Sequence, residues 1–306
     1  MHNLLTADKV MTAEAAVARF VRPGSVVGMG GQNINRCPMA LVHEVARQGA
    51  GDLTVVGCNL SLPLDILVAA GLVVRTEQGS GNLERYGTLF AWRRAVEAGR
   101  IDVRDHSHLT MATRFAAGAI GVPFLPTRSL LGSDVLTALV EDGVAQVLDD
   151  PWGGGPVVLV RALRPDVSLI HAHRADPFGN VVIEGVTSHE IDMVRASAAT
   201  VVSVEEIVPE GALNARPEEV TISGAYVSAV VAQPFGAFPT SVYRAYDFAE
   251  DEIKAYQALA RRGGDAHAAW LAENVLGPAD FDAHLRRADP EGTRRAALTE
   301  AMRSYV

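Results

Sequence analysis

Cysteines are scarce in this 306-residue sequence, and long apolar runs are missing. The two cysteines, Cys37 and Cys58, are too few for a disulfide framework or a structural zinc site. No stretch approaches the roughly 20 consecutive apolar residues that a membrane-spanning helix needs. The start, MHNLLTADKV, also lacks the basic and apolar regions of a signal peptide. We therefore expect a soluble protein of the reducing cytoplasm that does not bind a membrane.

Clustered positive charge is missing as well. The formal net charge is −9, and the only lysines are Lys9 and Lys254. Proteins that bind nucleic acids neutralise the phosphates with gathered Lys and Arg side chains. We therefore expect no nucleic acid among the partners of this chain.

The residues that are present alternate between helical and strand patterns. Residues 13–21 carry apolar positions at helical spacing, and a β-branched run at 25–28 follows the Pro23-Gly24 turn. Short Val-rich strands between helices are typical of parallel strands that are covered on both faces. The pattern continues with helices over 39–48, 62–70 and 89–98 and strands over 52–57, 72–78 and 101–107.

The second half of the chain continues as α/β. We expect an open, mostly parallel sheet with helices on both faces, in a single domain over 1–306 that ends in a helical extension over 247–306. Two prolines in PFLPTRSLLGSD, residues 123–134, exclude a helix and a central strand, so we expect an ordered loop there. The other predicted elements are a helix over 111–120 and strands over 157–162, 167–173, 180–185 and 199–207.

The turn GMGGQN, residues 28–33, joins a predicted strand to a predicted helix, and glycines in such a turn usually bring the backbone close to a ligand. It matches neither the dinucleotide fingerprint nor a P-loop, because the glycine spacing differs and no Gly-Lys-Ser/Thr follows. A strand-end approach through Gly28, Gly30 and Gly31 fits, beside the amides of Gln32 and Asn33, which can donate to a carbonyl or an oxyanion. An ordinary tight turn that needs positive φ fits equally well.

Other motifs give weaker signals. The pairs His106/His108 and His171/His173 sit at alternate positions near predicted strand ends, a spacing seen in metal sites. Nothing in the spacing fixes further ligands, so hydrogen-bonded or structural histidines are favoured and we expect no metal. Cys37 lies in the glycine-turn loop without a visible base and is interpreted as a bystander. No G-x-S-x-G elbow of a serine hydrolase is present.

Four segments in order, GMGGQNINRCP, GVPFLPTRSLLGSD, IHAHRADPFGNVV and QPFGAFPTSVYRAYD, resemble the family I CoA-transferases. The resemblance covers residues 10–250. Within the family, the chain most specifically resembles the alpha (A) subunit of glutaconate CoA-transferase and the alpha subunits of a steroid ring-opening CoA-ester hydrolase. It implies a homologous beta subunit, in a heterodimer or higher heteromer, with the active site between the two chains.

In the transferases of this family, the acyl-CoA thioester is attacked by a glutamate of the beta subunit, and CoA then passes to an acceptor carboxylic acid. Coenzyme A would be a substrate here, and no permanently bound cofactor is implied. The glycine-rich loop of the family lies against the active site, and the stretch QGSGNLERYG falls where the alpha subunit contacts the acyl carboxylate. The resemblance thus implies these substrate-binding residues: Gly30, Gly31, Gln32, Asn33, Ser80, Gly81 and Asn82.

Two departures from the family matter. Counting back from Pro123 places His108 where the ring-opening hydrolases carry a catalytic glutamate. A histidine can act as a base, but no orienting group is visible in the sequence, so a structural His108 is favoured. Phe238 replaces a polar histidine of many relatives and would make a nearby pocket more apolar. The resemblance also implies a D-x-x-G-N turn of architectural role at Asp176, Gly179 and Asn180.

The sequence therefore predicts the alpha subunit of an acyl-CoA:carboxylate CoA-transferase. The nearest alternative is a component of a CoA-ester hydrolase on the same scaffold. More distant alternatives are a sugar-phosphate isomerase and a noncatalytic partner of another chain. The isomerase would need basic residues that converge on a phosphate, and the turn region offers only Arg36.

Overall fold

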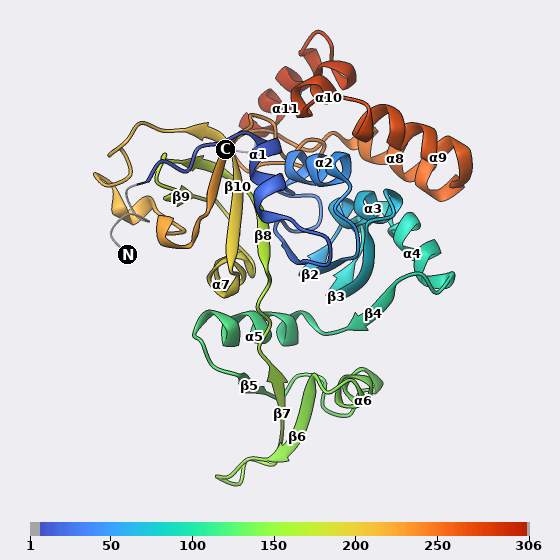
Figure 1. The fold of residues 1–306 in the computed structure, drawn as a ribbon, viewed down its shortest axis with the longest axis vertical. Coiled ribbons are helices and arrows are strands. Elements are labelled where there is room, and N and C mark those ends of the chain that lie inside the picture. Colours follow the sequence, from blue (N-terminus) through green and yellow to red (C-terminus); the bar gives the residue numbers. More distant parts are fainter. Residues whose placement is uncertain (1–6, 305–306) are drawn as a thin grey trace.

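The computed structural model describes residues 7–304 and has a central sheet of parallel strands (Figure 1). The strands lie in the order β11-β10-β8-β1-β2-β3-β4, and the short β9 adds to β8 in the antiparallel sense. The expected open, mostly parallel sheet is confirmed. The strands are β1 (Val26–Met29), β2 (Leu53–Leu60), β3 (Val73–Gly81), β4 (Asp102–Asp105), β8 (Val167–Ala175), β9 (Val181–Val182), β10 (Ala199–Ile207) and β11 (Ala229–Ala232).

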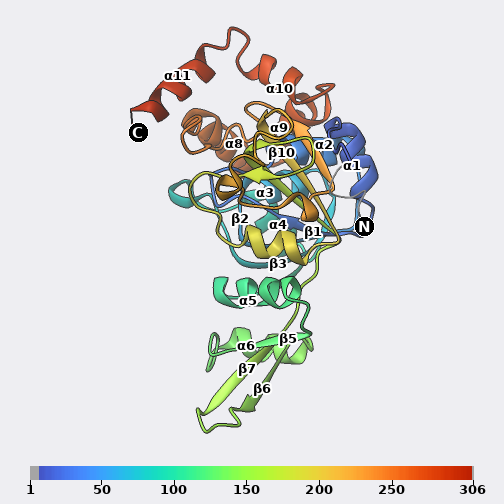
Figure 2. The same cartoon turned by 90° about the vertical axis from the view of Figure 1, so that its left-hand side faces the viewer.

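Helices cover both faces of this sheet, as predicted (Figures 1 and 2). Neighbouring residues of β2 face opposite cores: Val55 packs in the larger core and Val56 in the smaller one. The larger core lies under α1 (Ala13–Phe20), α2 (Met39–Gln48), α3 (Leu62–Ala69) and α4 (Phe90–Glu97), and the smaller under α5 (His108–Ala119) and α7 (Glu190–Ala196).

The C-terminal helices extend the layer over the larger core, since Tyr256, Leu271 and Phe281 belong to that core. The helical tail is thereby confirmed. No helix among residues 7–304 is long and apolar enough to cross a membrane. The tail comprises α8 (Glu250–Arg262), α9 (Gly264–Leu271), a π-helical turn at Ala272–Leu276, α10 (Phe281–Ala288) and α11 (Thr293–Arg303); short 3-10 turns lie at Glu84–Tyr86, Pro217–Glu219 and Gly224–Tyr226.

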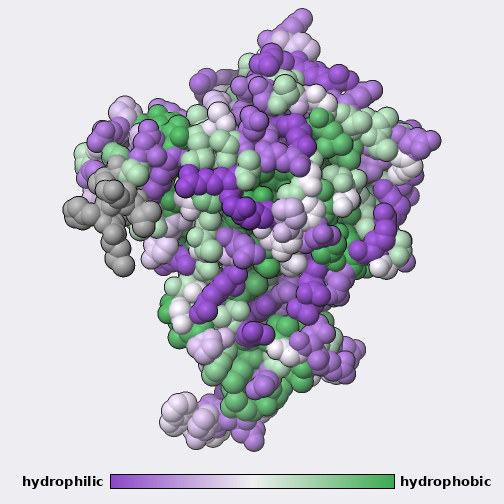
Figure 3. All heavy atoms as spheres, viewed as in Figure 1, coloured by the Kyte–Doolittle hydropathy of each residue, from purple (hydrophilic) through white to green (hydrophobic). Residues whose placement is uncertain are grey.

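A second, antiparallel sheet forms a small lobe beyond α5 (Figure 2). It consists of β5 (Phe124–Thr127), β7 (Pro156–Arg161) and β6 (Ala145–Asp149) in that order, with α6 (Asp134–Glu141) beside it. The Val-rich strand predicted at 157–162 is the centre of this lobe and not part of the parallel sheet. Figure 3 shows apolar side chains gathered on the lobe, where Trp152 is 92% exposed.

The loop predicted at 123–134 is wrong in part, because residues 124–127 form β5. This strand lies at the edge of its sheet, where Pro126 is tolerated since one side of an edge strand needs no amide donor. The strand predicted at 180–185 shrinks to the two residues of β9. The sequence patterns do not anticipate α6, β6, α7 and β11.

Candidate active site

A cavity of 290 Å³ opens at the carboxyl ends of β1 and β2, between α5 and α7. In open α/β sheets, ligands bind outside the carboxyl ends of the strands, where the strand order reverses. Here the chain continues from β1 to β2 on one side and returns to β8 on the other. The lining residues are Gln32, Cys58, Asn59, His108, Leu109, Ala112, Ser188, His189 and Asp192.

The glycine turn packs tightly behind this cavity. Gly31 has φ +84°, and a Cβ at this position would lie 2.9 Å from the Cα of Cys37. Its N–H donates to Oε1 of Glu190 over 2.9 Å. The N–H groups of Gly30 and Gln32 also donate within the chain, to carbonyls 2.9 Å away. The Gln32 side chain is therefore the part of this turn that lines the cavity and can contact a substrate.

A buried ion pair holds the turn in place. Glu190, the first residue of α7, pairs with Arg36. Arg36 also donates to the carbonyl oxygens of His171 at 2.7 Å and Val186 at 3.0 Å. The basic residue that the sequence offers in the turn region is thus fully engaged inside the protein and is not available to a phosphate.

None of the residues implied near the end of β3 lines the cavity, but Ser80 bonds two residues that do. Ser80 Oγ bonds Oδ1 of Asn59 and lies 2.9 Å from Nε2 of His108. Asn82 Oδ1 accepts the N–H of Glu84 over 2.9 Å, and Gly81 packs on the side chain of Gln78, so both shape the following turn. Outside the lining residues as well, Asn33 donates its side-chain amide to Glu84.

His108 has the orienting group that the sequence does not reveal. It begins α5, whose N-cap Ser107 forms a capping box with Thr110. Because Oδ1 of Asn59 can only accept, the Ser80 hydroxyl donates to it and in turn accepts from His108 Nε2–H. Nδ1 is then the unprotonated nitrogen of the neutral imidazole. The hydrogen bonds that link Asn59, Ser80 and His108 thus select one tautomer of His108 at the cavity.

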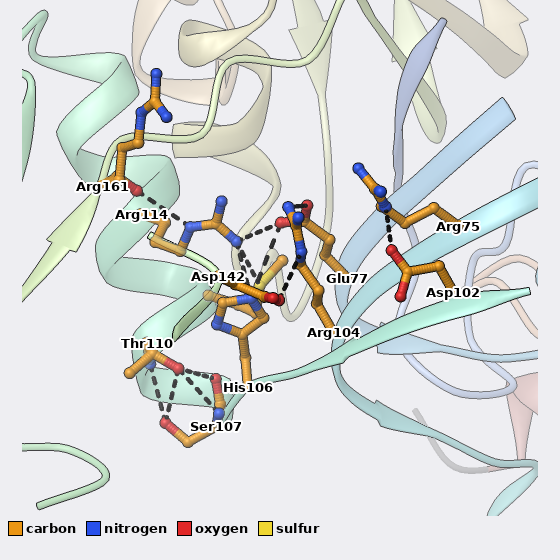
Figure 4. A network of polar contacts seen from close by, with 11 residues as sticks. Arg75, Glu77, Asp102, Arg104, His106, Ser107, Thr110, Arg114, Asp142 and Arg161 are labelled. Atoms are coloured by element: carbon orange, nitrogen blue, oxygen red, sulfur yellow. Dashed lines mark hydrogen bonds and ion pairs between the residues drawn. The ribbon is translucent and has the colours of Figure 1, made fainter. Parts of the chain in front are cut away.

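A buried polar network anchors α5 beneath this site (Figure 4). Arg114 of α5 donates to Glu77 of β3 over 2.5 Å, and Arg104 of β4 donates to the same carboxylate over 3.2 Å. Burial opposes ionisation of Glu77, but the two arginines outweigh it and its pKa lies below the usual value. Arg104 also bonds Asp142 at the end of α6, so the network reaches the small lobe.

His106 belongs to this network and not to the cavity. Its Nε2 accepts from Arg114 Nη1 over 2.9 Å. Burial, helped by the charge of Arg114, lowers the pKa of His106 to about 3. His106 and His108 therefore act in different surroundings and do not form a ligand pair.

The second histidine pair is also hydrogen-bonded within the chain. His171 bonds Ser203 at 2.8 Å and Glu205 at 2.6 Å, and His173 donates to the carbonyl of Tyr243 at 2.7 Å. Among residues 7–304, no group of three or more His, Cys, Asp or Glu side chains is arranged to hold a metal ion.

Both cysteines are buried and are poor nucleophiles. Burial raises the pKa of Cys37 to about 11 and that of Cys58 to about 12. A thiol attacks only as its thiolate, so neither side chain is activated at neutral pH.

Several lining residues escape sequence reasoning. His189 stacks on Phe115 with ring centroids 5.4 Å apart, and burial lowers its pKa so that it is neutral. Asp192 lies three positions further, on the first turn of α7, and Asn59 lies near the end of β2. The available signal is the polar stretch TSHEID at 187–192, which becomes meaningful once α7 is placed beside α5.

The other residues that the sequence analysis singles out lie outside the lining of the cavity. Asp176 accepts the N–H groups of Phe178 and Asn180 at 3.0 Å, and Gly179 in this turn has φ +87°, which fits an architectural role. Phe238 is 2% exposed in the larger core and lines a separate small cavity beside Met39, so it does not make the candidate site more apolar.

Residues 10–233 match the family described as Coenzyme A transferase. The chain is 32% identical to the A subunit of glutaconate CoA-transferase from Acidaminococcus fermentans, over 92% of both chains. The chain belongs to the coenzyme A transferases, among the A subunits of family I. The crystal structure of the A. fermentans enzyme superposes with a TM-score of 0.86 at 30% identity, covering 92% of this chain and 93% of that one.

Other proteins similar to this chain have different names. A cholesterol ring-cleaving hydrolase IpdA subunit of Mycobacterium tuberculosis is 32% identical over 80% of this chain and 85% of its own. An uncharacterized protein of Archaeoglobus fulgidus is 38% identical over 91% of this chain. The match spans 62% of that protein, less than two thirds of its length.

Proposed function

We propose that this chain is the A subunit of an acyl-CoA:carboxylate CoA-transferase that needs a B subunit to act. The observation that carries the proposal is the kind of side chain that lines the cavity. Amide, hydroxyl and imidazole groups line it, but no glutamate among residues 7–304 does. Glu190 lies behind the cavity, and its carboxylate already accepts the N–H of Gly31 and forms an ion pair with Arg36. Asp192 is the only carboxylate among the described lining residues.

In the proposed reaction, a carboxylate of the partner attacks the thioester carbonyl. The C–S bond breaks, CoA leaves as a thiolate, and an acyl anhydride remains on the partner. The thiolate then attacks the partner's carbonyl of the anhydride, whose C–O bond breaks, so the donor acid leaves as a carboxylate and a CoA thioester remains on the partner. The acceptor carboxylate attacks this thioester and takes the CoA by the reverse of these steps. This chain contributes donors for the developing oxyanion, which are Gln32 Nε2 and the Nδ2 of Asn59 that Ser80 leaves free.

The test compares the chain alone with the chain co-expressed with the product of a neighbouring beta-like gene. CoA transfer from acyl-CoA to a carboxylic acid should be absent for the chain alone and present for the complex. Asp192→Asn in the complex should keep the covalent half-reaction, because the nucleophile lies on the partner. Robust transfer by the purified chain alone would refute the proposal.

A CoA-ester hydrolase is the second candidate, favoured by one observation. The hydrogen bonds that link Asn59, Ser80 and His108 leave Nδ1 of His108 as an unprotonated base at the cavity, which could activate a water. Thioester cleavage without any acceptor acid, at a rate that equals the rate with acceptor, would favour this function over transfer.

A further inference from the structure

Two walls of the candidate active-site cavity differ in their chemistry. The wall from α5 carries the apolar side chains of Leu109 and Ala112, and Leu109 is 59% exposed. The wall from α7, which lies beside α5 (Figure 1), carries Asp192 and, in the turn before the helix, Ser188. None of the described residues that line the cavity is Lys or Arg. The cavity therefore offers an apolar surface on one side and a hydroxyl and a carboxylate on the other.

Ser188 occupies a backbone position that usually belongs to glycine. Its φ is +47°, and the N–H of Glu190 donates to the carbonyl of Thr187 over 3.0 Å, which closes a turn around Ser188 and His189. His189 has φ −90° and ψ −1°. These values are typical of a type II′ turn, whose first central residue has positive φ and is most often Gly, Asn or Asp. A serine there is strained, and strained residues cluster at functional sites.

The fold makes little use of the Ser188 hydroxyl. Its only hydrogen bond with residues 7–304 is a long one, with 3.3 Å between Oγ and Nδ1 of the neighbouring His189. The residue is exposed and lines the cavity. No strong contact within the described residues offsets the strain, and the hydroxyl remains able to bind a ligand.

Asp192 supplies a second, independent group on the same wall. Its carboxylate lines the cavity and forms no hydrogen bond or ion pair with residues 7–304. Neither of its oxygens is among the partnerless polar atoms that are sealed from solvent, so both can meet a ligand. Glu190, on the same turn of α7, differs because Arg36 and Gly31 already engage it. Asp192 is thus a charged acceptor without a partner at the cavity.

We propose that this wall binds a hydroxyl group on the acyl chain of the substrate, which donates its O–H to Asp192 and accepts from Ser188. A carboxylate at this place would be repelled by Asp192, and an ammonium group has no acceptor for the Ser188 proton. The carbons of the acyl chain pack against Leu109 and Ala112. The substrate class is therefore a hydroxyacyl-CoA. This class rests on the proposed function, because it places the acyl group of a CoA thioester in this cavity.

The experiment measures the binding of CoA thioethers to the complex with the B subunit by calorimetry. S-butyl-CoA is compared with S-(3-hydroxybutyl)-CoA and S-(4-hydroxybutyl)-CoA, which share the CoA part and have no thioester to break. The better hydroxyl analogue should bind roughly tenfold more tightly than S-butyl-CoA, the order expected for a hydrogen bond to a charged group. Ser188→Ala and Asp192→Ala should each remove most of this difference.

Two further variants serve as controls. Asp105 is an exposed carboxylate at the carboxyl end of β4 that does not line the cavity, so Asp105→Ala should keep the wild-type ratio of Kd values. Ser188→Gly separates the hydroxyl from the backbone, because glycine suits the first central position of the turn. It should have a higher Tm than Ser188→Ala and show the same loss of preference for the hydroxyl analogue.

Equal Kd values of the three thioethers for the wild-type complex, or no binding of any of them, would overturn the proposal. A wild-type ratio that survives in both Ser188→Gly and Asp192→Ala would overturn it as well. So would tighter binding of S-(3-carboxypropyl)-CoA than of either hydroxyl analogue. These ratios do not depend on turnover, whereas the proposed function is tested by CoA transfer, so the failure of one is distinguishable from the failure of the other.

Discussion

The protonated nitrogen of His108 determines what this side chain can do. If His108 is the base of a hydrolase, His108→Ala should lower hydrolysis by roughly 100- to 10,000-fold, the usual contribution of a general base. In a transferase, the same change should leave CoA transfer within roughly tenfold, because the partner's carboxylate carries the covalent step. Both rates should be measured on the complex, with and without acceptor acid. We expect transfer to survive; hydrolysis that is fast in wild type and lost in the variant would show the opposite.

Gly31 tests whether the glycine turn is required by packing. Gly31→Ala should lower the free energy of unfolding by more than Gly49→Ala, as measured by urea denaturation. Both positions have positive φ, which costs an alanine about 1–2 kcal/mol. A Cβ at Gly49 meets nothing within 4 Å, whereas at Gly31 it meets the backbone of Cys37 at 2.9 Å. Equal losses for the two variants would contradict this packing argument.

Single residues of the site are only partly visible in the sequence. Gln32 and His108 can be found because each follows a recognisable strand or motif. Asn59 and His189 cannot, because they reach the cavity through the pairing of β2 with β1 and the packing of α7 on α5. Such contacts join distant segments, and no local spacing predicts them.

At the scale of elements, α5 depends on its buried ion pair with β3. Arg114→Met should destabilise the fold by about 3–5 kcal/mol, because it leaves the buried carboxylate of Glu77 without its main partner. Arg75→Met is the control: the exposed pair of Arg75 and Asp102 should contribute at most about 1 kcal/mol. Urea denaturation of both variants provides the comparison, and similar losses would mean that the Glu77 network does not anchor α5.

Elements with strong periodicity are predicted well, and short ones are not. The helix over 39–48 coincides with α2, because its apolar face repeats at helical spacing against the sheet. The four-residue strands β5 and β11 carry too few residues for a pattern, and β5 also contains Pro126. Their pairing partners, β7 and β10, stabilise them from elsewhere in the chain.

At the scale of the whole molecule, the single domain over 1–306 stays a prediction. The small lobe has its own antiparallel sheet and its own apolar cluster, which includes Leu139 and Val158. It is tied to the main body by Arg104–Asp142 and by the bond from Arg114 Nε to the carbonyl of Arg161 at 3.1 Å. We expect one calorimetric transition for the full chain. Two separate transitions, with the lobe melting first, would divide it into two domains.

Buried neutral histidines should make the whole fold sensitive to acid. Burial lowers the pKa of His106 to about 3 and that of His284 to about 4, and it lowers the pKa of His43 well below its usual value. The unfolded chain takes up protons on these groups below its ordinary pKa of about 6.5, whereas the folded chain does not. The free energy of unfolding is therefore highest above about pH 6.5 and falls as the pH drops toward the folded pKa values.

His106 and His284 should each lower the free energy of unfolding by about 2 kcal/mol at pH 5, because one pKa unit corresponds to about 1.4 kcal/mol. Urea denaturation at pH 7.5 and pH 5.0 measures the difference. His106→Gln keeps an acceptor for Arg114 but cannot titrate, so its stability should fall less between the two pH values than that of wild type. An unchanged pH dependence in this variant would mean that His106 does not contribute to the acid sensitivity.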